Sequence, residues 1–344
     1  MSRILFVDPV CPRPYQARTL YDRALGQAEA NAVRVAEGLA QRGHRVTVAQ
    51  CGRQWPARSP GGVSYVGFDY DGSWRHLPGA DAVVVVRQHK VLPRVRRHYA
   101  GARLALWVHG VPGSKRRRLA AVAGETGATV VCVSDAHRAA VRERLGDGWA
   151  RTARIHSPVD EALVPDGTPT DPDKLVTFSE PGAGLAEVLA AFGHVRRVRP
   201  GARLYVAGPG RLPALPPGAV PLGALPHREA VRHVRGAFAV FHPQARFEEP
   251  FGLAFAEANA VGTPVLAHPH PAACEVLGET AADRRQLVDA RDPEAAARRL
   301  TRWWDEGRPV VAGSPQFAAG RVVGDWERLL GVARPMPRPL AVAA

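Results

Sequence analysis

Along the first half of the chain, segments with the apolar pattern of a buried strand alternate with segments that have the apolar spacing of a helix. Short apolar runs rich in Val, Ile and Leu predict buried strands, and the segments between them carry apolar residues at helical spacing. Strands are expected at Arg3–Asp8, Arg45–Gln50, Val63–Phe68, Ala82–Arg87, Leu104–His109 and Thr129–Ser134, and helices at Gln27–Arg42 and Ala136–Leu145. The first helix is the clearest, because its apolar residues share one face and Gly43 follows as a stop. Strands that alternate with helices predict a parallel sheet covered on both faces.

The alternation restarts after a polar break at Val164–Asp173, which is rich in Pro, Gly and Asp and predicts a linker. Beyond it we expect strands at Lys174–Ser179, Arg203–Ala207, Phe238–His242 and Pro264–Ala267, and helices at Leu185–Val198, Arg228–Arg235 and Phe251–Val261. The predicted fold class is α/β, with two Rossmann-like doubly wound domains, residues 1–163 and 174–320, facing a cleft. Residues 321–344 form a last helix, expected to pack back on the first domain, and a tail.

Composition agrees with a globular protein of two domains. The chain has 344 residues, of which 46% are hydrophobic and 23% charged, and a single core rarely serves that length. No apolar run approaches the roughly 18 residues of a membrane-spanning helix, and the N-terminus resembles a strand more than a signal peptide. We therefore expect a cytoplasmic protein. The scattered cysteines form no C-x-x-C pair, which disfavours a disulfide framework or zinc site.

The formal net charge of +14 raises the question of nucleic-acid binding. The basic residues are spread along the whole chain, are nearly all Arg, and form no known nucleic-acid motif. We therefore expect no nucleic-acid partner, although the charge favours anionic small molecules such as nucleotide sugars. The run Lys115–Arg118 is expected to be the solvated face of a helix. Contact with an anionic lipid head or a phosphorylated acceptor, and hence peripheral membrane contact, is the less favoured alternative.

Two junctions between a strand and a helix could hold a ligand, because ligands in open α/β sheets bind outside the carboxyl ends of the strands. The first is Ala24–Glu29, before the long helix. Gly26 would let backbone approach a ligand, and the free N–H groups of the helix start favour a phosphate. The spacing does not match the dinucleotide fingerprint, so a turn glycine without a ligand is an equal alternative.

The second junction, His242–Val265, is more specific. Glu249 is expected at the strand end, Pro250 and Phe251 at the start of a helix, and Glu257 about two turns along it. At ~1.5 Å per helical residue, the two carboxylates are separated by about the span of a nucleotide sugar. Between them lie N–H groups that could face a diphosphate, those of Phe251, Gly252, Leu253 and Ala254. Glu257, costly if buried unpaired in an apolar helix, could accept hydrogen bonds from a ribose diol.

This segment resembles the hallmark of the retaining glycosyltransferases of the group 1, or family 4, type. Glu249 to Val265 fits the pattern Glu-x7-Glu followed by Ala-x-Ala-x-Gly-x-Pro-Val. Gly26–Glu29 resembles the family's Gly-Gly-x-Glu turn, with Gln27 in place of the second glycine. Further similar segments follow in the family's order: Arg42–Val46, Trp107–His109, Val131–Ser134 and Arg203–Gly210. The resemblance covers nearly the whole chain.

The resemblance implies a GT-B fold and a role for each matching residue. Glu249 would hold the donor sugar near the reacting centre, and His109 would contact it, as the catalytic pair. Glu257 would hold the ribose, and Gly26 and Gln27 would approach the distal phosphate. Without the resemblance, His109 could equally be a strand-end histidine bonded to backbone.

The implied reaction is transfer of a sugar, with retention, from a nucleotide-diphosphate sugar to an unidentified hydroxylated acceptor. A UDP-sugar is the expected donor. No metal or other cofactor is expected, because helix starts and basic side chains stabilise the departing diphosphate. Acceptor contacts would come from loops such as Pro9–Ala24 and Val111–Ser114. The sequence specifies neither the acceptor nor the oligomeric state.

The chain departs from the family where an Arg and a Lys usually neutralise the diphosphate. By alignment Phe178 and Ala183 occupy these positions, and Glu180 adds the opposite charge. Each positioned donor lost at a developing charge costs roughly 3 kcal/mol of barrier. Other cations could substitute, and the candidates from loops near the cleft are Arg13, Arg18, Arg211 and Arg246.

Three interpretations follow from this departure. The favoured one is an active glycosyltransferase, since Glu249, Glu257 and His109 are all retained. The second is a non-catalytic member of the same fold that binds a nucleotide or a sugar. The third is another reaction on the same scaffold, such as phosphorolysis or epimerisation, because a fold does not dictate its chemistry.

Overall fold

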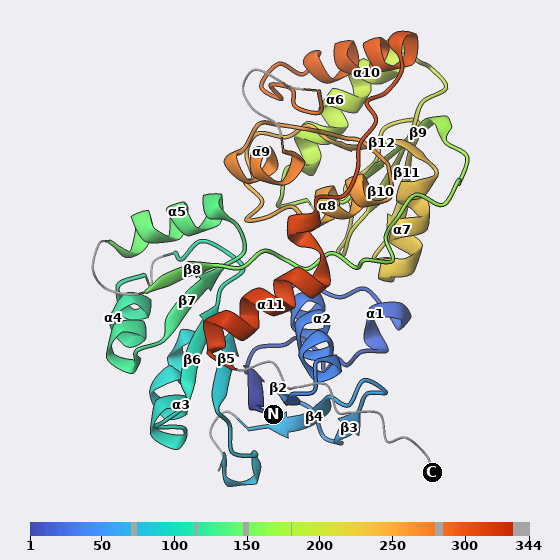
Figure 1. Ribbon diagram of the computed structural model, residues 1–344. Coiled ribbons are helices and arrows are strands. Elements are labelled where there is room, and N and C mark those ends of the chain that lie inside the picture. Colours follow the sequence, from blue (N-terminus) through green and yellow to red (C-terminus); the bar gives the residue numbers. More distant parts are fainter. Residues whose placement is uncertain (70–73, 114–115, 147–150, 180, 279–284, 333–344) are drawn as a thin grey trace, which may run out of the picture.

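The computed structural model describes residues 1–69, 74–113, 116–146, 151–179, 181–278 and 285–332, which form two α/β domains (Figure 1). Lys115, Glu180 and the tail Ala333–Ala344, which the sequence analysis discussed, lie outside these residues. None of the helices in the described ranges is both long and apolar enough to cross a membrane.

The first domain contains an eight-stranded sheet in the order β3-β4-β2-β1-β5-β6-β7-β8, parallel except for β3. Its strands are β1 (Arg3–Asp8), β2 (Arg45–Cys51), β3 (Ala57–Arg58), β4 (Ser64–Phe68), β5 (Ala82–Val86), β6 (Arg103–Trp107), β7 (Thr129–Cys132) and β8 (Thr152–Arg154). Its helices are α1 (Thr19–Asp22), α2 (Gln27–Gln41), α3 (Leu92–His98), α4 (Arg116–Thr126) and α5 (Asp135–Leu145), with 3-10 turns η1 (Trp74–His76) and η2 (His89–Val91).

Successive residues of β1 enter different cores, as the period of two in a strand requires. Ile4 and Phe6 belong to the core that includes residues of α2 and α11, while Leu5 and Val7 join residues of α3 and α4 on the other face. The central strands are therefore buried on both faces. This burial explains the nearly continuous apolar runs from which the sheet was predicted.

The second domain contains a five-stranded parallel sheet in the order β11-β10-β9-β12-β13. Its strands are β9 (Asp171–Thr177), β10 (Arg203–Ala207), β11 (Ala219–Gly223), β12 (Ala237–His242) and β13 (Val265–Ala267). Its helices are α6 (Leu185–Val198), α7 (His227–Arg235), α8 (Leu253–Ala260), α9 (Pro271–Leu277) and α10 (Ala295–Glu306), followed by the 3-10 turn η3 (Pro315–Phe317). Helices α6 and α10 pack together on one face.

The last helix, α11 (Ala319–Leu330), lies against α2 of the first domain (Figure 1). Trp326 packs edge-on against Trp107 of β6, with ring centroids 4.7 Å apart. Glu327 is bonded to Arg42 at 2.6 Å and to His44 at 3.0 Å. The Arg-Gly-His segment after α2, noted for its family resemblance, thus anchors α11 in this chain.

The predicted elements are present, and their ends differ by a few residues. Helix α6 and strand β10 have the predicted bounds. Strands β5, β6 and β7 end one or two residues early, so that Arg87, His109 and Ser134 follow the strands at their carboxyl ends. The predicted linker is shorter than expected because β9 begins at Asp171. Helices α1, α3 and α9 were not predicted, and they are too short for a periodic signal.

Candidate active site between the two domains

A cavity of about 440 Å³ opens between the domains. The first domain contributes the turn at Gly26 and Gln27 and residues of α1 and α2, and the second contributes Glu249 and the start of α8. Six residues predicted for the site line this cavity: Gly26, Gln27, Glu249, Gly252, Leu253 and Glu257. Two strand-to-helix junctions far apart in sequence therefore face one space.

Glu257 is held in the cavity by groups from both domains. Its Oε1 lies 2.8 Å from Nη2 of Arg34, on α2, and 2.9 Å from Nε2 of His227, at the start of α7. Burial alone would raise the pKa of Glu257, but Arg34 and His227 outweigh it, and the pKa lies below its usual value. The carboxylate expected to accept ribose hydroxyls is therefore ionised and already placed.

Three polar residues on one face of α2 hold the chain segment that follows β8. Gln27 Nε2 and Asn31 Nδ2 donate to Ser157 Oγ at 3.2 and 2.9 Å, and Arg34 Nη1 donates to the Pro158 carbonyl at 3.3 Å. The side chain of Gln27 is thus engaged within the protein. Its backbone is helical, so a side chain at the family's second glycine position introduces no positive φ.

The start of α8 differs from the prediction. Helix α8 begins at Leu253 rather than Phe251, because Gly252 has φ 84° and does not continue a helix backward. A Cβ at Gly252 would lie 2.8 Å from Cδ2 of Phe255, so both backbone and space require glycine. Phe251, predicted to face the donor, is fully buried, and its ring packs edge-on against Phe317 at 5.1 Å.

A second cavity, of about 550 Å³, lies in the first domain and shares Gly26 and Gln27 with the first. It is also lined by Glu29, Arg87 and the segment Val108–Gly113, which includes His109. Burial, and then the nearby charge of Arg87, lowers the pKa of His109 to about 3. His109 is therefore a neutral imidazole in the first-domain cavity. It does not line the interdomain cavity that contains Glu249.

Arg87, which lines this second cavity, forms ion pairs with two carboxylates. Its Nη1 lies 2.8 Å from Glu29, and its Nη2 lies 3.0 Å from Asp8, which also accepts from the Tyr15 hydroxyl at 3.0 Å. With φ 64°, Arg87 is the one non-glycine residue of positive φ in the described ranges. Such strain persists only where surrounding contacts hold it, and it concentrates at functional sites.

Asp8 differs from Glu257 in the direction of its pKa shift. It is fully buried, and burial raises its pKa more than the ion pair with Arg87 and the hydrogen bonds lower it. Arg87 is shared with Glu29, so each carboxylate receives only part of one positive charge. The carboxylates on this side thus outnumber their cation.

The cations suggested from the sequence line neither cavity. Arg13 and Arg211 are exposed, and Arg18 pairs with Asp22 at 3.0 Å on α1. Arg246 pairs with Glu187 at 2.7 Å and its side chain is 85% exposed. Phe178 does line the interdomain cavity, at the place where the family has its Arg, whereas Ala183 does not.

Sequence reasoning missed the cations that the fold does bring to the site, Arg34 and Arg87, and it missed His227. Arg34 lies about two turns beyond Gln27 on α2, a spacing that places it over the same cavity. That helical spacing was the available signal. Among the described residues, no three His, Cys, Asp or Glu side chains gather as metal ligands do.

Comparison with known proteins agrees with this arrangement. Residues 178–310, which span most of the second domain, match the family model described as glycosyl transferases group 1. No match was found among curated proteins.

Similar solved structures extend over both domains. The α,α-trehalose 6-phosphate synthase of Burkholderia multivorans is 13% identical, with a TM-score of 0.65 and coverage of 96% of this chain and 98% of that one. WaaG, a glycosyltransferase involved in lipopolysaccharide biosynthesis, is 14% identical, with a TM-score of 0.58 and coverage of 96% and 97%.

A third similar structure is the pneumococcal O-GlcNAc transferase GtfA in complex with UDP and GlcNAc. It is 13% identical, with a TM-score of 0.54, and the match covers 73% of this chain and 57% of that one. The chain likewise spans 56% of the length of the S. aureus TarM structure. At such identities the likeness shows the fold. This protein therefore has the two-domain GT-B glycosyltransferase fold, and residues 178–310 of its second domain match the family model of glycosyl transferases group 1.

Proposed function

We propose that the protein transfers a sugar, with retention, from a nucleotide-diphosphate sugar to a hydroxylated acceptor. The observation that supports this most is the interdomain cavity, lined by Glu249 and Glu257 with the start of α8 between them and the Gly26 turn opposite. The group 1 match over residues 178–310 supports the same activity independently of the cavity. The similar structures that contain UDP favour a UDP-sugar as donor.

In this proposal the donor lies along α8. The ribose hydroxyls donate to the ionised carboxylate of Glu257, and the diphosphate faces the N–H groups at Gly252 and Leu253 and at the Gly26 turn. The sugar lies beside Glu249, towards the shared turn at Gly26 and Gln27. The acceptor occupies the second cavity, beyond that turn, where neutral His109 and Glu29 offer hydrogen-bonding groups.

The reaction breaks the bond between the anomeric carbon and the diphosphate oxygen and forms one to the acceptor oxygen on the same face. The acceptor proton passes to the leaving phosphate. Backbone N–H groups at the two helix starts stabilise the developing negative charge, so no metal ion is proposed. Arg34 is the cation that lines this cavity, at the Glu257 end.

A second candidate function is binding of a nucleotide or sugar without turnover. It is favoured by one observation: an apolar side chain, Phe178, lines the cavity where the family places a cation for the diphosphate. Arg34 does not replace that cation directly, because its guanidinium is bonded to Glu257. The two candidates differ in whether the diphosphate can depart.

Release of nucleoside diphosphate from UDP-glucose, UDP-galactose and UDP-GlcNAc tests the proposal, with water and simple sugars as acceptors. We expect release by the wild type and its loss in Glu249→Gln, with nucleotide binding retained by that variant. Turnover by Glu249→Gln at the wild-type rate would contradict the assignment of Glu249.

The variant Phe178→Arg, which introduces a cation at a residue that lines the cavity, distinguishes the second candidate. A large gain in donor binding, with no release by the wild type, would favour a protein that binds without turnover. Little change in binding, together with release by the wild type, would favour the enzyme.

A further inference from the structure

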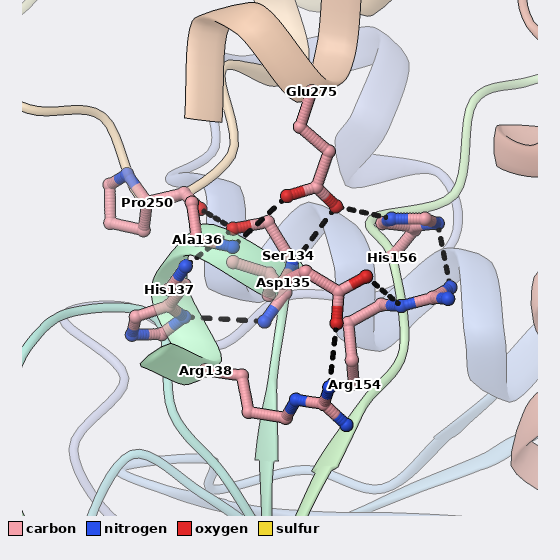
Figure 2. A network of polar contacts seen from close by, with 10 residues as sticks. Ser134, Asp135, Ala136, His137, Arg138, Arg154, His156, Pro250 and Glu275 are labelled. Carbon is pink, nitrogen blue, oxygen red and sulfur yellow. Dashed lines mark hydrogen bonds and ion pairs between the residues drawn. The ribbon is translucent and has the colours of Figure 1, made fainter. Parts of the chain in front are cut away.

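The first helix turn of α5 receives its hydrogen-bond partners from the other domain. Glu275, on α9, accepts from the N–H groups of Asp135 and Ala136, both at 3.0 Å (Figure 2). The third N–H, that of His137, donates to Ser134 Oγ at 2.8 Å. The free N–H groups that begin a helix are thus satisfied within the protein, so this helix start is not available to an anionic ligand.

Ser134 also contacts the loop that carries Glu249. Its hydroxyl donates to the Pro250 carbonyl at 2.6 Å, and its side chain is fully buried (Figure 2). One hydroxyl therefore accepts from the first domain and donates to the second. Because the Ser134 oxygen is fixed by the α5 start, it constrains where the Pro250 peptide lies.

Aromatic packing and a histidine support the same contact between the domains. His156 Nε2 lies 2.8 Å from Glu275, and the His156 ring packs against Phe251, with centroids 5.8 Å apart. Phe251 in turn packs against Phe317. Phe251, in the loop before α8, is thus held by its ring, while Pro250 is held through its carbonyl.

We propose that Ser134 is a positioning residue for Glu249, which it orients through its hydrogen bond to the Pro250 carbonyl. Glu275 and His156 keep the α5 start, and with it Ser134, against the second domain. The loop of residues 249–252 therefore depends on a hydrogen bond from the first domain for its position. Nothing in this role requires Ser134 to touch a substrate.

The functional consequence rests on the proposed transferase activity. Glu249 is expected to hold the donor sugar and Glu257 the nucleoside, and the Ser134 contact lies next to Glu249. Loss of the hydroxyl should therefore reduce the contribution of the sugar to the free energy of donor binding. The contribution of the nucleotide should stay nearly unchanged. A general loss of stability would instead weaken both together.

The test compares Ser134→Ala with a matched control, Thr126→Val. Thr126 is also buried in the first domain, and its hydroxyl donates to the Val122 carbonyl at 2.6 Å within α4. Each variant removes one buried hydroxyl-to-carbonyl bond, and Ser134→Ala also removes the acceptor of the His137 N–H. Glu275→Gln is a second variant, which weakens the contact from the other domain should Ser134→Ala fold poorly.

Two readouts are measured on the full chain. The first is amide hydrogen exchange of residues 251–256, and the second is the ratio of the dissociation constants of UDP and of UDP-glucose. For Ser134→Ala and Glu275→Gln we expect faster exchange over residues 251–256. We expect the ratio to fall roughly three- to tenfold, as loss of one hydrogen bond predicts, with UDP binding within about twofold of wild type. Thr126→Val should change neither readout.

Exchange over residues 251–256 that matches Thr126→Val in both test variants would overturn the positioning role. An equal weakening of UDP and UDP-glucose would also overturn it, since that pattern indicates a structural role only. Should the wild type bind neither ligand, the proposed donor fails, and the exchange experiment still decides whether Ser134 holds the loop.

Discussion

Two clusters of ion pairs lie on opposite sides of the Gly26 turn. Both combine carboxylates with basic side chains, but basic groups outnumber carboxylates in one and carboxylates outnumber the basic group in the other. In the interdomain cavity, one carboxylate, Glu257, lies between Arg34 and His227. In the first-domain cavity, one guanidinium, Arg87, is shared by Asp8 and Glu29. The pKa of Glu257 is lowered and that of Asp8 is raised, although burial opposes ionisation in both.

The difference teaches that burial alone does not determine the charge of a cleft. The pKa of Glu257, which has two basic partners of its own, is lowered, whereas the pKa of Asp8, which shares its one arginine with Glu29, is raised. The interdomain cavity therefore holds an ionised carboxylate with its partners already in place. The first-domain cavity contains one arginine of positive φ that is paired with two carboxylates.

The largest expected effect comes from removing that arginine. Arg87→Met leaves Asp8 and Glu29 buried without their common cation, and we expect a loss of roughly 3–5 kcal/mol in the free energy of unfolding. Arg34→Met should cost less, because Glu257 retains His227. Urea unfolding of the three proteins measures both effects.

Arg246→Met is the control for these substitutions. Arg246 pairs with Glu187, but its side chain is 85% exposed, and we expect a change below about 1 kcal/mol. Equal losses for Arg87→Met and Arg34→Met would remove the proposed difference between the clusters.

A smaller effect is expected from Gly26→Ala. The backbone of Gly26 suits any residue, but an added Cβ would lie 2.4 Å from Oε2 of Glu29, which is paired with Arg87. Glu29 must then move away from its cation, at a cost of roughly 1–3 kcal/mol. The matched control is Gly193→Ala in α6, where nothing lies within 4 Å of the new Cβ and a stabilisation of up to about 1 kcal/mol is expected. A stabilised Gly26→Ala protein would show that Glu29 is not held against the turn.

The smallest effects concern pH. The pKa of Asp8 is raised above 3.8 in the folded protein, so the folded state binds more protons, and the Asp8 contribution to stability falls as pH rises from 3.8 through the raised value. The pKa of Glu257 is lowered below 4.5, so its contribution is present above 4.5 and is lost as pH falls. Differences in unfolding free energy between the wild type and Asp8→Asn or Glu257→Gln, measured from pH 3 to 7, should have opposite slopes. Slopes of the same sign would contradict the assigned protonation.

Periodicity predicted the fold because the central strands are buried on both faces and the long helices present one apolar face. Helix α6 was predicted with its observed bounds for this reason. The start of α8 was not, because Gly252 has φ 84°, so that the helix begins only at Leu253, and the apolar pattern around it does not reveal that backbone conformation.

The site was predicted only in part, for a similar reason. Glu249, Glu257 and Gly26 lie in local motifs, and the structure brings them to one cavity. Arg34 and His227 come from other elements: the contact of Glu257 with His227 forms within the folded second domain, and its contact with Arg34 forms only after the domains pack. The cations predicted from loops do not line the cavity, because the position of a loop residue in the sequence does not determine where its side chain points. Arg18 and Arg246 instead form local ion pairs on exposed surfaces.

The measurement that tests the central claim most directly is calorimetric titration with UDP, GDP, ADP and dTDP and their common sugar conjugates. The wild type, Glu257→Gln and a control, Glu306→Gln at an exposed position of α10, are compared. The account predicts that the wild type and the control bind one nucleotide series, UDP foremost. Glu257→Gln should bind it about tenfold or more weakly, because a charged hydrogen-bond acceptor is lost. Absence of binding by the wild type, or equal binding by Glu257→Gln, would contradict the claim that this cavity is a nucleotide-sugar site.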